Sequence, residues 1–276
     1  VSYIFQRAAA LNRPVVINQS QGDNLGPHDG TSLLERGLDN LLGGPGRAMV
    51  KSAGNAGADR IHAQGTVAPG VPQIVQFGVV PQDTTPETMD IWYEGTDRFD
   101  FRITEPGGPT SATVSPGSPT TLTLGNGNSV FVDSRVNDPN NGDNRIFLTI
   151  ARGTAPTLEA GTWSFTLVGT TVVNGRFDAW IQRGQAIAAF VGAHQNPDNT
   201  ISTPGTAVKM ITAGSYITRG AGVPGISAFS SRGPTRDGRP APDVAAPGQF
   251  IMSAAASVLG LADAYQLMQG TSMAAP

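Results

Sequence analysis

Residues 269–276 read QGTSMAAP, and this short run decides how the rest of the chain is interpreted. Ser272 lies among small residues, which leave room for another backbone to approach its hydroxyl. A serine hydroxyl is a poor nucleophile unless a base takes its proton and donors receive the charge that develops on the carbonyl oxygen. A Gly-Thr-Ser run on its own is more typical of a structural helix cap, so the partners of Ser272 must be sought elsewhere in the sequence.

The composition favours many turns and strands over long surface helices. The chain has 276 residues, including 35 glycines and 21 prolines, and this length fits one large or two modest domains. The formal net charge of -3 gives no electrostatic reason to expect nucleic acid or an anionic membrane as a partner. No apolar run approaches the roughly 20 residues that span a bilayer, and the lack of cysteine excludes disulfides and thiolate metal sites.

Helix and strand signals alternate in residues 1–65. An amphipathic helix is predicted before Pro14, a buried strand at residues 15–18, a second helix at 32–44 and a second strand at 48–55. This alternation with short connections is typical of a doubly wound α/β fold with a parallel sheet.

The pattern changes in residues 66–200 and then changes back. Short segments there alternate apolar and polar residues between turn clusters such as SPGSP and GNGN, which predicts an antiparallel β-sandwich or jelly roll. Residues 201–276 return to buried strands separated by extended segments. We therefore expect an inserted β-sandwich domain at 66–200 that interrupts an α/β domain formed by 1–65 and 201–276.

Four stretches outside the predicted sandwich resemble the subtilases, the subtilisin-like serine peptidases. The run GTSMAAP resembles their nucleophile motif, and ISAFSSRGPT and PDVAAPG resemble the strands before it. The run KSAGNAG resembles the segment that carries their oxyanion-hole asparagine, and VVINQSQGD resembles the strand that pairs with the substrate backbone. These runs occur in the family's order, and the resemblance implies a partial subtilisin-like sheet and cleavage of polypeptides by an endopeptidase.

The resemblance assigns roles to individual residues. Ser272 matches the nucleophile, and Asn55 matches the side-chain donor of the oxyanion hole, where a neutral NH2 group has no proton to lose. The matching positions of the substrate strand and the first specificity pocket are Ser20, Gln21, Gly22, Ala53 and Gly54. Gln21 and Asp23 differ from the more apolar and glycine-rich residues common in the family, which leaves the pocket preference open.

The family's acid and base are not found in this sequence. No Asp occurs in an Asp-Ser-Gly or Asp-Thr-Gly turn, and no His-Gly-Thr motif is present. His28 lies in PHDGTS, where Asp29 interrupts the motif and the position in the chain is wrong, so we predict a loop residue. We predict that His62 and His194 are surface or hinge residues. The simplest hypothesis is a chain that begins downstream of the acid and base, and we expect this polypeptide alone to have no peptidase activity.

Two further features are weighed against simpler interpretations. Residues 138–144, DPNNGDN, carry oxygens at a density that suits calcium, but they lack the length and final Glu of an EF-hand loop, so a plain β-turn is favoured. Aromatic and Asp positions in MDIWYEG and GRFDAWI are more typical of sandwich core and edge than of a binding face. We therefore predict no cofactor, with calcium left open.

Three functional hypotheses remain from the sequence. The first is a secreted or cell-surface subtilase whose sandwich shapes access to the cleft, a location implied only by the family. The second is a non-enzymatic binding module in which the sandwich is the working part, and the third is a pseudopeptidase. The oligomeric state is left open.

Overall fold

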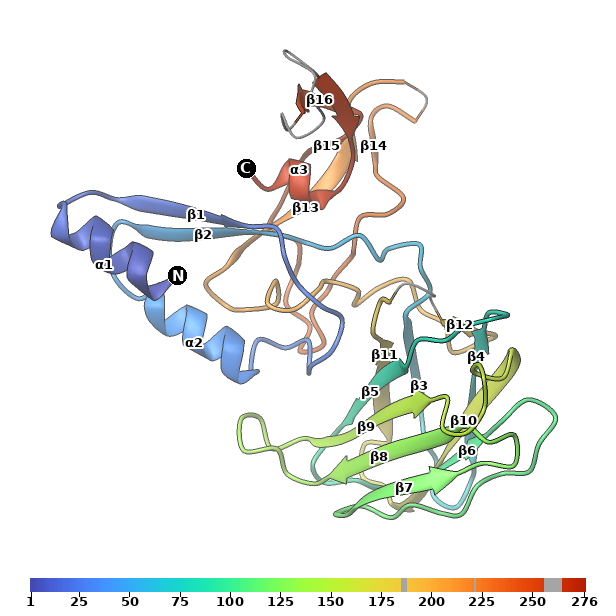
Figure 1. Ribbon diagram of the computed structural model, residues 1–276. Helices are drawn as coiled ribbons and strands as arrows, with labels where there is room; N and C mark the ends of the chain where they lie inside the picture. The colour runs from blue at the N-terminus through green and yellow to red at the C-terminus, as the bar shows by residue number, and fades with distance from the viewer. Residues whose placement is uncertain (185–187, 221, 256–264) are drawn as a thin grey trace. The chain divides into compact units, whose positions relative to one another are not determined.

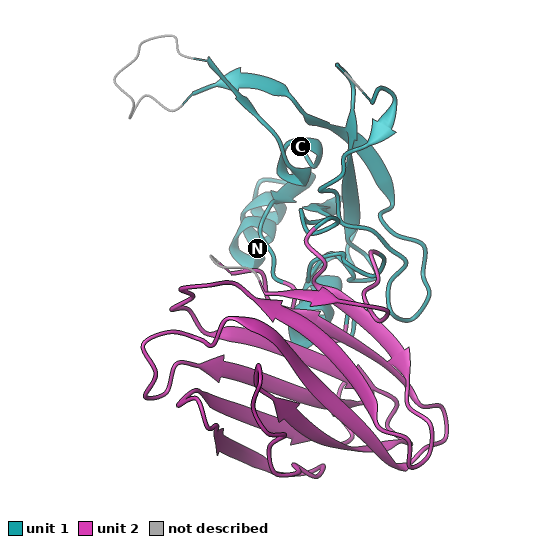
Figure 2. Ribbon diagram, turned by 90° about the vertical axis from the view of Figure 1, so that its right-hand side faces the viewer, with its two compact units in different colours: residues 1–23, 28–58, 198–276 teal, residues 24–27, 59–197 magenta. Residues whose placement is uncertain are grey.

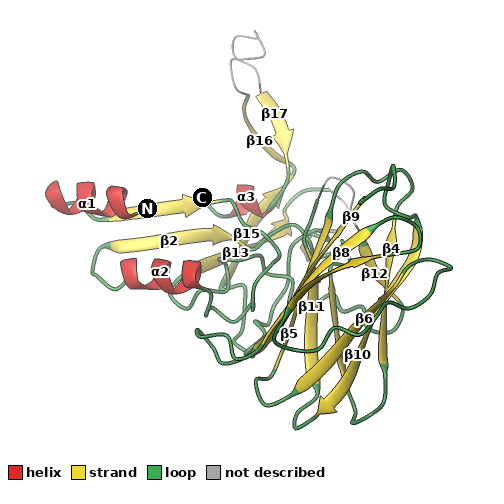
Figure 3. Ribbon diagram, turned by 60° about the horizontal axis from the view of Figure 1, so that its bottom comes forward, coloured by secondary structure: helices red, strands yellow, loops and turns green. Residues whose placement is uncertain are grey.

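The computed structural model describes residues 1–184, 188–220, 222–255 and 265–276. The chain divides into two compact units, of which the first comprises residues 1–23, 28–58 and 198–276 and the second comprises 24–27 and 59–197 (Figure 2). Parallel strands dominate the main sheet of the first unit and antiparallel strands the second, and the described helices are few and short (Figure 3). None of the described helices has the length and apolar character needed to cross a membrane.

A mostly parallel sheet forms the centre of the first unit. Its strands are β1 (Val15–Gln19), β2 (Arg47–Ser52), β13 (Ile211–Ile217), β14 (Gly225–Ile226) and β15 (Val244–Gln249) (Figure 1). β2 pairs in parallel with β1 and with β13, and β13 pairs in parallel with β15, whereas β14 runs antiparallel to β13. This confirms the predicted parallel strands.

Two helices accompany the sheet at the positions that periodicity predicted: α1 (Ser2–Ala10) and α2 (Leu33–Leu41). One hydrophobic cluster joins buried apolar side chains of α1, of α2 and the residue after it, of β2 and of the segment before β13: Phe5, Leu38, Leu42, Met49, Ala207 and Met210. The sheet is therefore anchored by apolar contacts close to the point where β2 leads into the candidate site.

The side chain of Ser32 caps the N-terminus of α2. The Ser32 hydroxyl accepts a hydrogen bond from the Glu35 N–H at 3.3 Å and donates to Glu35 Oε2 at 2.8 Å. Thr206 Oγ1 donates to the other carboxyl oxygen at 2.5 Å, and burial raises the pKa of Glu35 above its usual value. This carboxyl group therefore ties the start of α2 to the loop that precedes β13.

Two antiparallel sheets make up the second unit. One has the strand order β12-β4-β10-β6 and the other the order β3-β11-β5-β9-β8-β7. Burial alternates along β9 and β10, one strand from each sheet, so these strands have one buried and one more exposed face, whereas β5 and β11 are buried on both faces. The strands are β3 (His62–Thr66), β4 (Gln73–Val79), β5 (Glu87–Tyr93), β6 (Arg98–Thr104), β7 (Pro119–Thr123), β8 (Ser129–Arg135), β9 (Asn144–Ala151), β10 (Gly161–Thr171), β11 (Arg176–Ile181) and β12 (Ala189–Val191).

The C-terminal part of the first unit forms a hairpin followed by a short helix. β16 (Ile251–Ala254) pairs antiparallel with β17 (Tyr265–Met268), and α3 (Thr271–Ala274) follows directly. α3 contacts β2, β13 and β15. The residues that carry GTSMAAP therefore lie against the central parallel sheet.

Candidate active site

Gly270 sets the geometry of the turn that leads into α3. Its φ angle of 151° lies in the region that favours glycine, and its N–H donates to Gly248 O at 2.8 Å. A Cβ atom at this position would lie 3.2 Å from Asn55 Nδ2, which is tighter than an ordinary contact. Gly270 thus allows the start of α3 to approach Asn55 closely. Ser272, the second residue of α3, is half-buried.

The Asn55 side chain joins the end of β2 to the start of α3. Its Oδ1 accepts hydrogen bonds from Thr271 N at 2.9 Å and Thr271 Oγ1 at 3.0 Å, across 216 positions of sequence. These donors require the oxygen on this side of the amide, so the Nδ2 group takes the opposite side. Within the described residues, Nδ2 has no hydrogen-bond acceptor. The NH2 group that would stabilise an oxyanion is thus available.

Thr271 fixes the neighbouring backbone, a role that the sequence interpretation missed. Its Oγ1 also accepts a hydrogen bond from Gly54 N at 3.0 Å. The signal was present in the order Gly-Thr-Ser, since a buried threonine before the serine supplies both a donor and an acceptor. Thr271, which is only 1% exposed, therefore holds both Gly54 and Asn55.

Close contacts fix Ala53 and Gly54 in the loop that leaves β2. Ala53 N donates to Ala213 O at 2.9 Å, and Ala53 O accepts from Ser202 N at 2.8 Å. Gly54 has a φ angle of 110°, and an added Cβ atom would lie 2.9 Å from Ser202 Oγ. Ala53 and Gly54 are therefore held between β13 and the segment that contains Ser202.

Ser20 connects the segment after β1 to α3. Its hydroxyl donates to the carbonyl oxygen of Ser272 at 3.4 Å. Gln21 and Gly22 are exposed, and within the described residues neither forms a hydrogen bond with Ser272 or Asn55. The structure thus brings Ser20, Asn55 and Ser272 together through Thr271 and the α3 backbone, and it leaves Gln21 and Gly22 on the surface beside them.

The three histidines have other partners. His28 Nδ1 lies 2.9 Å from Ile201 O, and His194 Nε2 lies 2.6 Å from the Gln73 side chain. His62 Nε2 lies 3.1 Å from Asp178 Oδ1 and the ring is fully buried, so the prediction of a surface or hinge residue was wrong for His62. A buried imidazole is retained there because the carboxylate offers it a hydrogen bond. None of these contacts involves Ser272.

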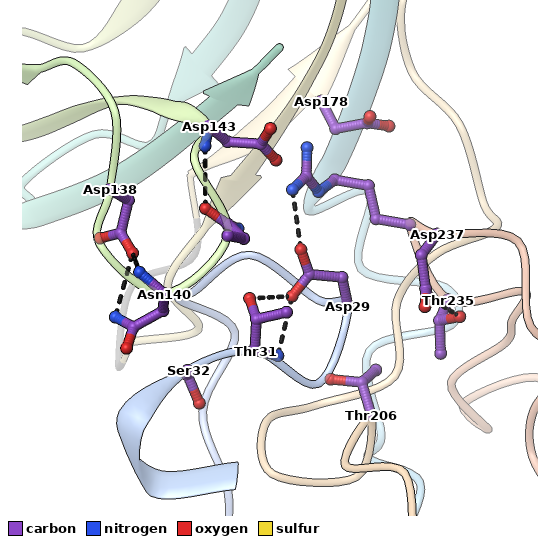
Figure 4. Close-up of polar contacts among 12 residues, drawn as sticks. Asp29, Thr31, Ser32, Asp138, Asn140, Asp143, Asp178, Thr206, Thr235 and Asp237 are labelled. Carbon is purple, nitrogen blue, oxygen red and sulfur yellow. Dashed lines mark hydrogen bonds and ion pairs between the residues drawn. The ribbon is translucent and has the colours of Figure 1, made fainter. Parts of the chain in front are cut away.

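Asp29, the residue that interrupts the histidine motif, forms hydrogen bonds that hold its own loop in place. Asp29 Oδ1 accepts from Thr31 N at 2.9 Å and from Thr31 Oγ1 at 2.5 Å, and Asp29 Oδ2 accepts from Arg236 at 2.9 Å (Figure 4). Asp29 thereby links this loop to the segment after β14. His28 is a loop residue, as predicted, and its ring is buried.

The turn at residues 138–144 is organised by its own side chains. Asp138 Oδ1 accepts from Asn140 N at 2.9 Å and from Asn140 Nδ2 at 3.0 Å (Figure 4). Across the described ranges, no group of three or more His, Cys, Asp or Glu side chains is placed to hold a metal ion. The turn therefore has the hydrogen bonds of an Asx turn.

Comparisons with known proteins agree with the resemblance of the GTSMAAP run to the subtilases. The Subtilase family model matches residues 159–276, a stretch that includes Ser202 and Ser272. The chain is 31% identical over 134 residues to pyrolysin from Pyrococcus furiosus, covering 40% of this chain and 9% of pyrolysin. It is 36% identical over 77 residues to an uncharacterized protein of Aquifex aeolicus, covering 26% of this chain and 35% of that protein.

The fold is also shared with a solved protease structure. The structure of the Clostridium perfringens CspB protease superposes with a TM-score of 0.86 at 24% identity, covering 99% of this chain and 55% of that chain. The present chain therefore spans about half of that structure, and a smaller share of the two curated relatives.

Proposed function

We propose that the chain is part of a subtilisin-like serine endopeptidase in which Ser272 is the nucleophile, a proposal supported by the Subtilase family match over residues 159–276 and by the similarity to pyrolysin. Asn55 Nδ2 and the Ser272 backbone N–H would donate to the oxyanion. Ser20, Gln21 and Gly22 would pair with the extended substrate, in the strand-addition mode of peptide recognition. Polypeptides are the proposed substrates.

The proposed reaction is acyl transfer through Ser272. Ser272 Oγ attacks the scissile carbonyl carbon while a base takes the hydroxyl proton, and the carbonyl oxygen becomes an oxyanion. The same base returns the proton to the leaving amine, and an acyl-serine remains, which water hydrolyses to regenerate Ser272. Donation by Asn55 stabilises the oxyanion because a fixed dipole needs no reorganisation as the charge develops.

One observation carries this proposal: the oxygen of the Asn55 side-chain amide accepts hydrogen bonds from Thr271, the residue before Ser272, whereas its NH2 group has no acceptor among the described residues. Asn55 is half-buried and its Nδ2 is not among the buried atoms that lack a partner, so this group is open to solvent or to a bound molecule. The arrangement fits a donor kept ready for substrate.

We expect the isolated 276-residue polypeptide to lack peptidase activity. Activation of Ser272 requires a base within hydrogen-bond reach, and the histidine contacts described above lead elsewhere. A fluorophosphonate probe is expected to label this polypeptide no faster than its Ser272→Ala variant. Rapid labelling that disappears with Ser272→Ala would show that a base is already present in this chain.

The oxyanion role is tested in a polypeptide that also supplies the acid and base. Asn55→Asp is expected to lower kcat about 100- to 1000-fold with little change in KM, a magnitude known from the equivalent donor of subtilisin itself. An unchanged kcat would remove Asn55 from the mechanism.

The second unit is proposed to be an inserted, jelly-roll-like β-sandwich at residues 66–200, between catalytic segments 1–65 and 201–276. The two antiparallel sheets, with burial that alternates along β9 and β10, support this proposal. Its expected role is to shape access to the cleft. A deletion that joins the flanking segments should alter the preference among long substrates more than that among short ones.

No cofactor is needed in this proposal, and secretion or surface display is proposed from the family alone. The Asp138 carboxylate is already engaged by Asn140, which disfavours tight calcium binding at residues 138–144. Calorimetric titration with calcium is expected to show no site of micromolar affinity that is lost on Asp138→Asn. Fractionation of the producing cells tests the location.

A further inference from the structure

The first unit contains a pocket of about 340 Å³ beside β13, β14 and β15 (Figure 1). It is lined by Gly214 of β13, Ile226 of β14, Ala245 of β15 and the segments 230–233 and 241–242. Pockets that bind small ligands span roughly 300–1,000 Å³, so this one suits a compact ligand. None of the residues proposed above for catalysis or substrate binding is among its described lining residues.

Small residues on neighbouring strands leave room for the pocket. Gly214 and Ala245 are partners in the parallel register of β13 and β15, so two adjacent positions of the sheet carry a single methyl group. A Cβ atom added to Gly214 would lie 2.9 Å from Pro242 Cγ, so a larger residue there would not fit without a shift of the pocket wall. Ala245 and Ile226 are exposed, and the pocket is therefore open to solvent.

Arg232 is the one charged residue among the described lining residues. It is held in place by its backbone, whose N–H donates to Thr200 Oγ1 at 2.9 Å and whose carbonyl oxygen accepts from Thr200 N at 2.8 Å. Its side chain is exposed, and within the described ranges its guanidinium forms no hydrogen bond or ion pair. The carboxylate of Asp243, which follows the pocket residue Pro242, accepts from Thr212 N at 2.7 Å. Arg232 can therefore bind the carboxylate of a ligand through two parallel hydrogen bonds.

We propose that this pocket binds the C-terminal residue of a peptide, with the terminal carboxylate on Arg232 and a large apolar side chain over Gly214 and Ala245. Apolar surface and a cationic group lie close together here, and a C-terminal leucine or phenylalanine carries its apolar side chain and its carboxylate on the same carbon atom. Charge complementarity with Arg232 excludes a cationic ligand. The binding does not depend on the proposed peptidase function, although hydrolysis of a peptide bond releases a C-terminal carboxylate of this kind.

The wall of the pocket also holds the loop after β2. Ser231 Oγ accepts a hydrogen bond from Ala56 N at 3.1 Å, and Ser231 N donates to Gly54 O at 2.9 Å. Ser231 is 2% exposed, so water does not compete for these bonds. Gly54 and Ala56 flank Asn55, and a ligand that restrains Ser231 restrains both of them. Occupation of the pocket is therefore expected to slow the local opening of this loop.

Peptide binding to the 276-residue chain tests the pocket without requiring catalysis. Three fluorescein-labelled peptides share a glycine-serine stem and end in leucine with a free carboxylate, leucine amide or alanine with a free carboxylate, and fluorescence anisotropy gives their affinities. The leucine acid is expected to bind at least about tenfold more tightly than either of the others, because each of them lacks the charge or the apolar area.

Variants and hydrogen exchange locate the bound peptide. Arg232→Met should remove the advantage of the leucine acid over the amide. Ala245→Phe, which fills the pocket, should weaken the leucine acid by at least about tenfold. Arg13→Met, the matched control, replaces an exposed arginine outside the pocket and should change nothing. Saturation with the leucine acid should slow amide exchange in a peptic fragment that contains Ala56.

Each other result counts against a defined part of the proposal. On the unmodified chain, equal binding of leucine acid and amide overturns recognition of a carboxylate, and equal binding of leucine and alanine acids overturns the apolar pocket. Displacement of the labelled peptide by octanoate at lower concentration than by N-acetyl-leucine assigns the pocket to a free fatty acid instead. Unchanged binding in Arg232→Met or Ala245→Phe places the peptide elsewhere, and unchanged exchange at Ala56 removes the link to the loop. If none of the three peptides binds, the proposal is wrong.

Discussion

Replacing Asn55 should loosen the nucleophile segment, by an amount that follows from two hydrogen bonds. Asn55→Ala removes the acceptor of Thr271 N and Thr271 Oγ1. A neutral hydrogen bond contributes about 0.5–1.5 kcal/mol, and a buried group left unsatisfied costs about 1–3 kcal/mol. Because Thr271 is only 1% exposed, we expect the free energy of local opening to fall by about 2 kcal/mol, which is about 30-fold in rate.

Amide hydrogen exchange measures this opening directly. Mass spectrometry of a peptic fragment that contains Thr271 should show about 30-fold faster exchange in Asn55→Ala than in the original chain. Asn55→Asp keeps an acceptor oxygen and should leave exchange nearly unchanged, although it loses the NH2 group that we propose as the oxyanion donor. Asn174→Ala, in an exposed turn of the second unit, is the control. Equal exchange in Asn55→Ala and the original chain, or equally fast exchange in Asn55→Asp and Asn55→Ala, would refute the anchoring role.

Further predictions concern backbone geometry and buried charge. Gly54→Ala should destabilise the first unit by about 1–3 kcal/mol, because φ is 110° and the added Cβ would lie 2.8 Å from Ser231 Oγ. Gly37→Ala, in α2 with open space at the Cβ position, should instead stabilise the first unit by about 0.5–1 kcal/mol. Amide hydrogen exchange of the first unit should be faster in Gly54→Ala and slower in Gly37→Ala than in the original chain. Burial raises the pKa of Glu87 to about 8, so the folded state holds this proton where the unfolded chain has lost it. The second unit should therefore lose stability as the pH rises from 4.5 through 8, and Glu87→Gln should make its stability less dependent on pH. Denaturation followed by tryptophan fluorescence measures this, because the second unit contains all three tryptophans.

The elements that depend on apolar periodicity were predictable from the sequence. α1, α2, β1 and β2 all occur where that periodicity placed them. β3 was missed because its sequence, HAQGT, contains almost no apolar residue. It is a strand because it pairs antiparallel with β11. Pairing between strands distant in sequence leaves no local signal, so such strands appear only once the partner is known.

The candidate site was predictable to the extent that motifs carry it. The motifs indicated Asn55 and Ser272, and their roles remain predictions. The hydrogen bonds through Thr271 could not be read from the sequence, since they join segments on either side of the second unit. The burial of His62 was misjudged because its carboxylate partner, Asp178, lies 116 positions away.

The long separation between Asn55 and Thr271 also has a consequence during synthesis. Asn55 leaves the ribosome 216 residues before Thr271, and at about 5–20 residues per second this is a delay of roughly 10–40 s. Nearly all of the second unit is synthesised within that interval, and the loop after β2 lacks its hydrogen-bond partner Thr271 until the interval ends. Asn55 and Thr271 therefore cannot form their hydrogen bonds until residue 271 has been added, so the loop after β2 gains this contact only after residues 59–197 of the second unit have been synthesised.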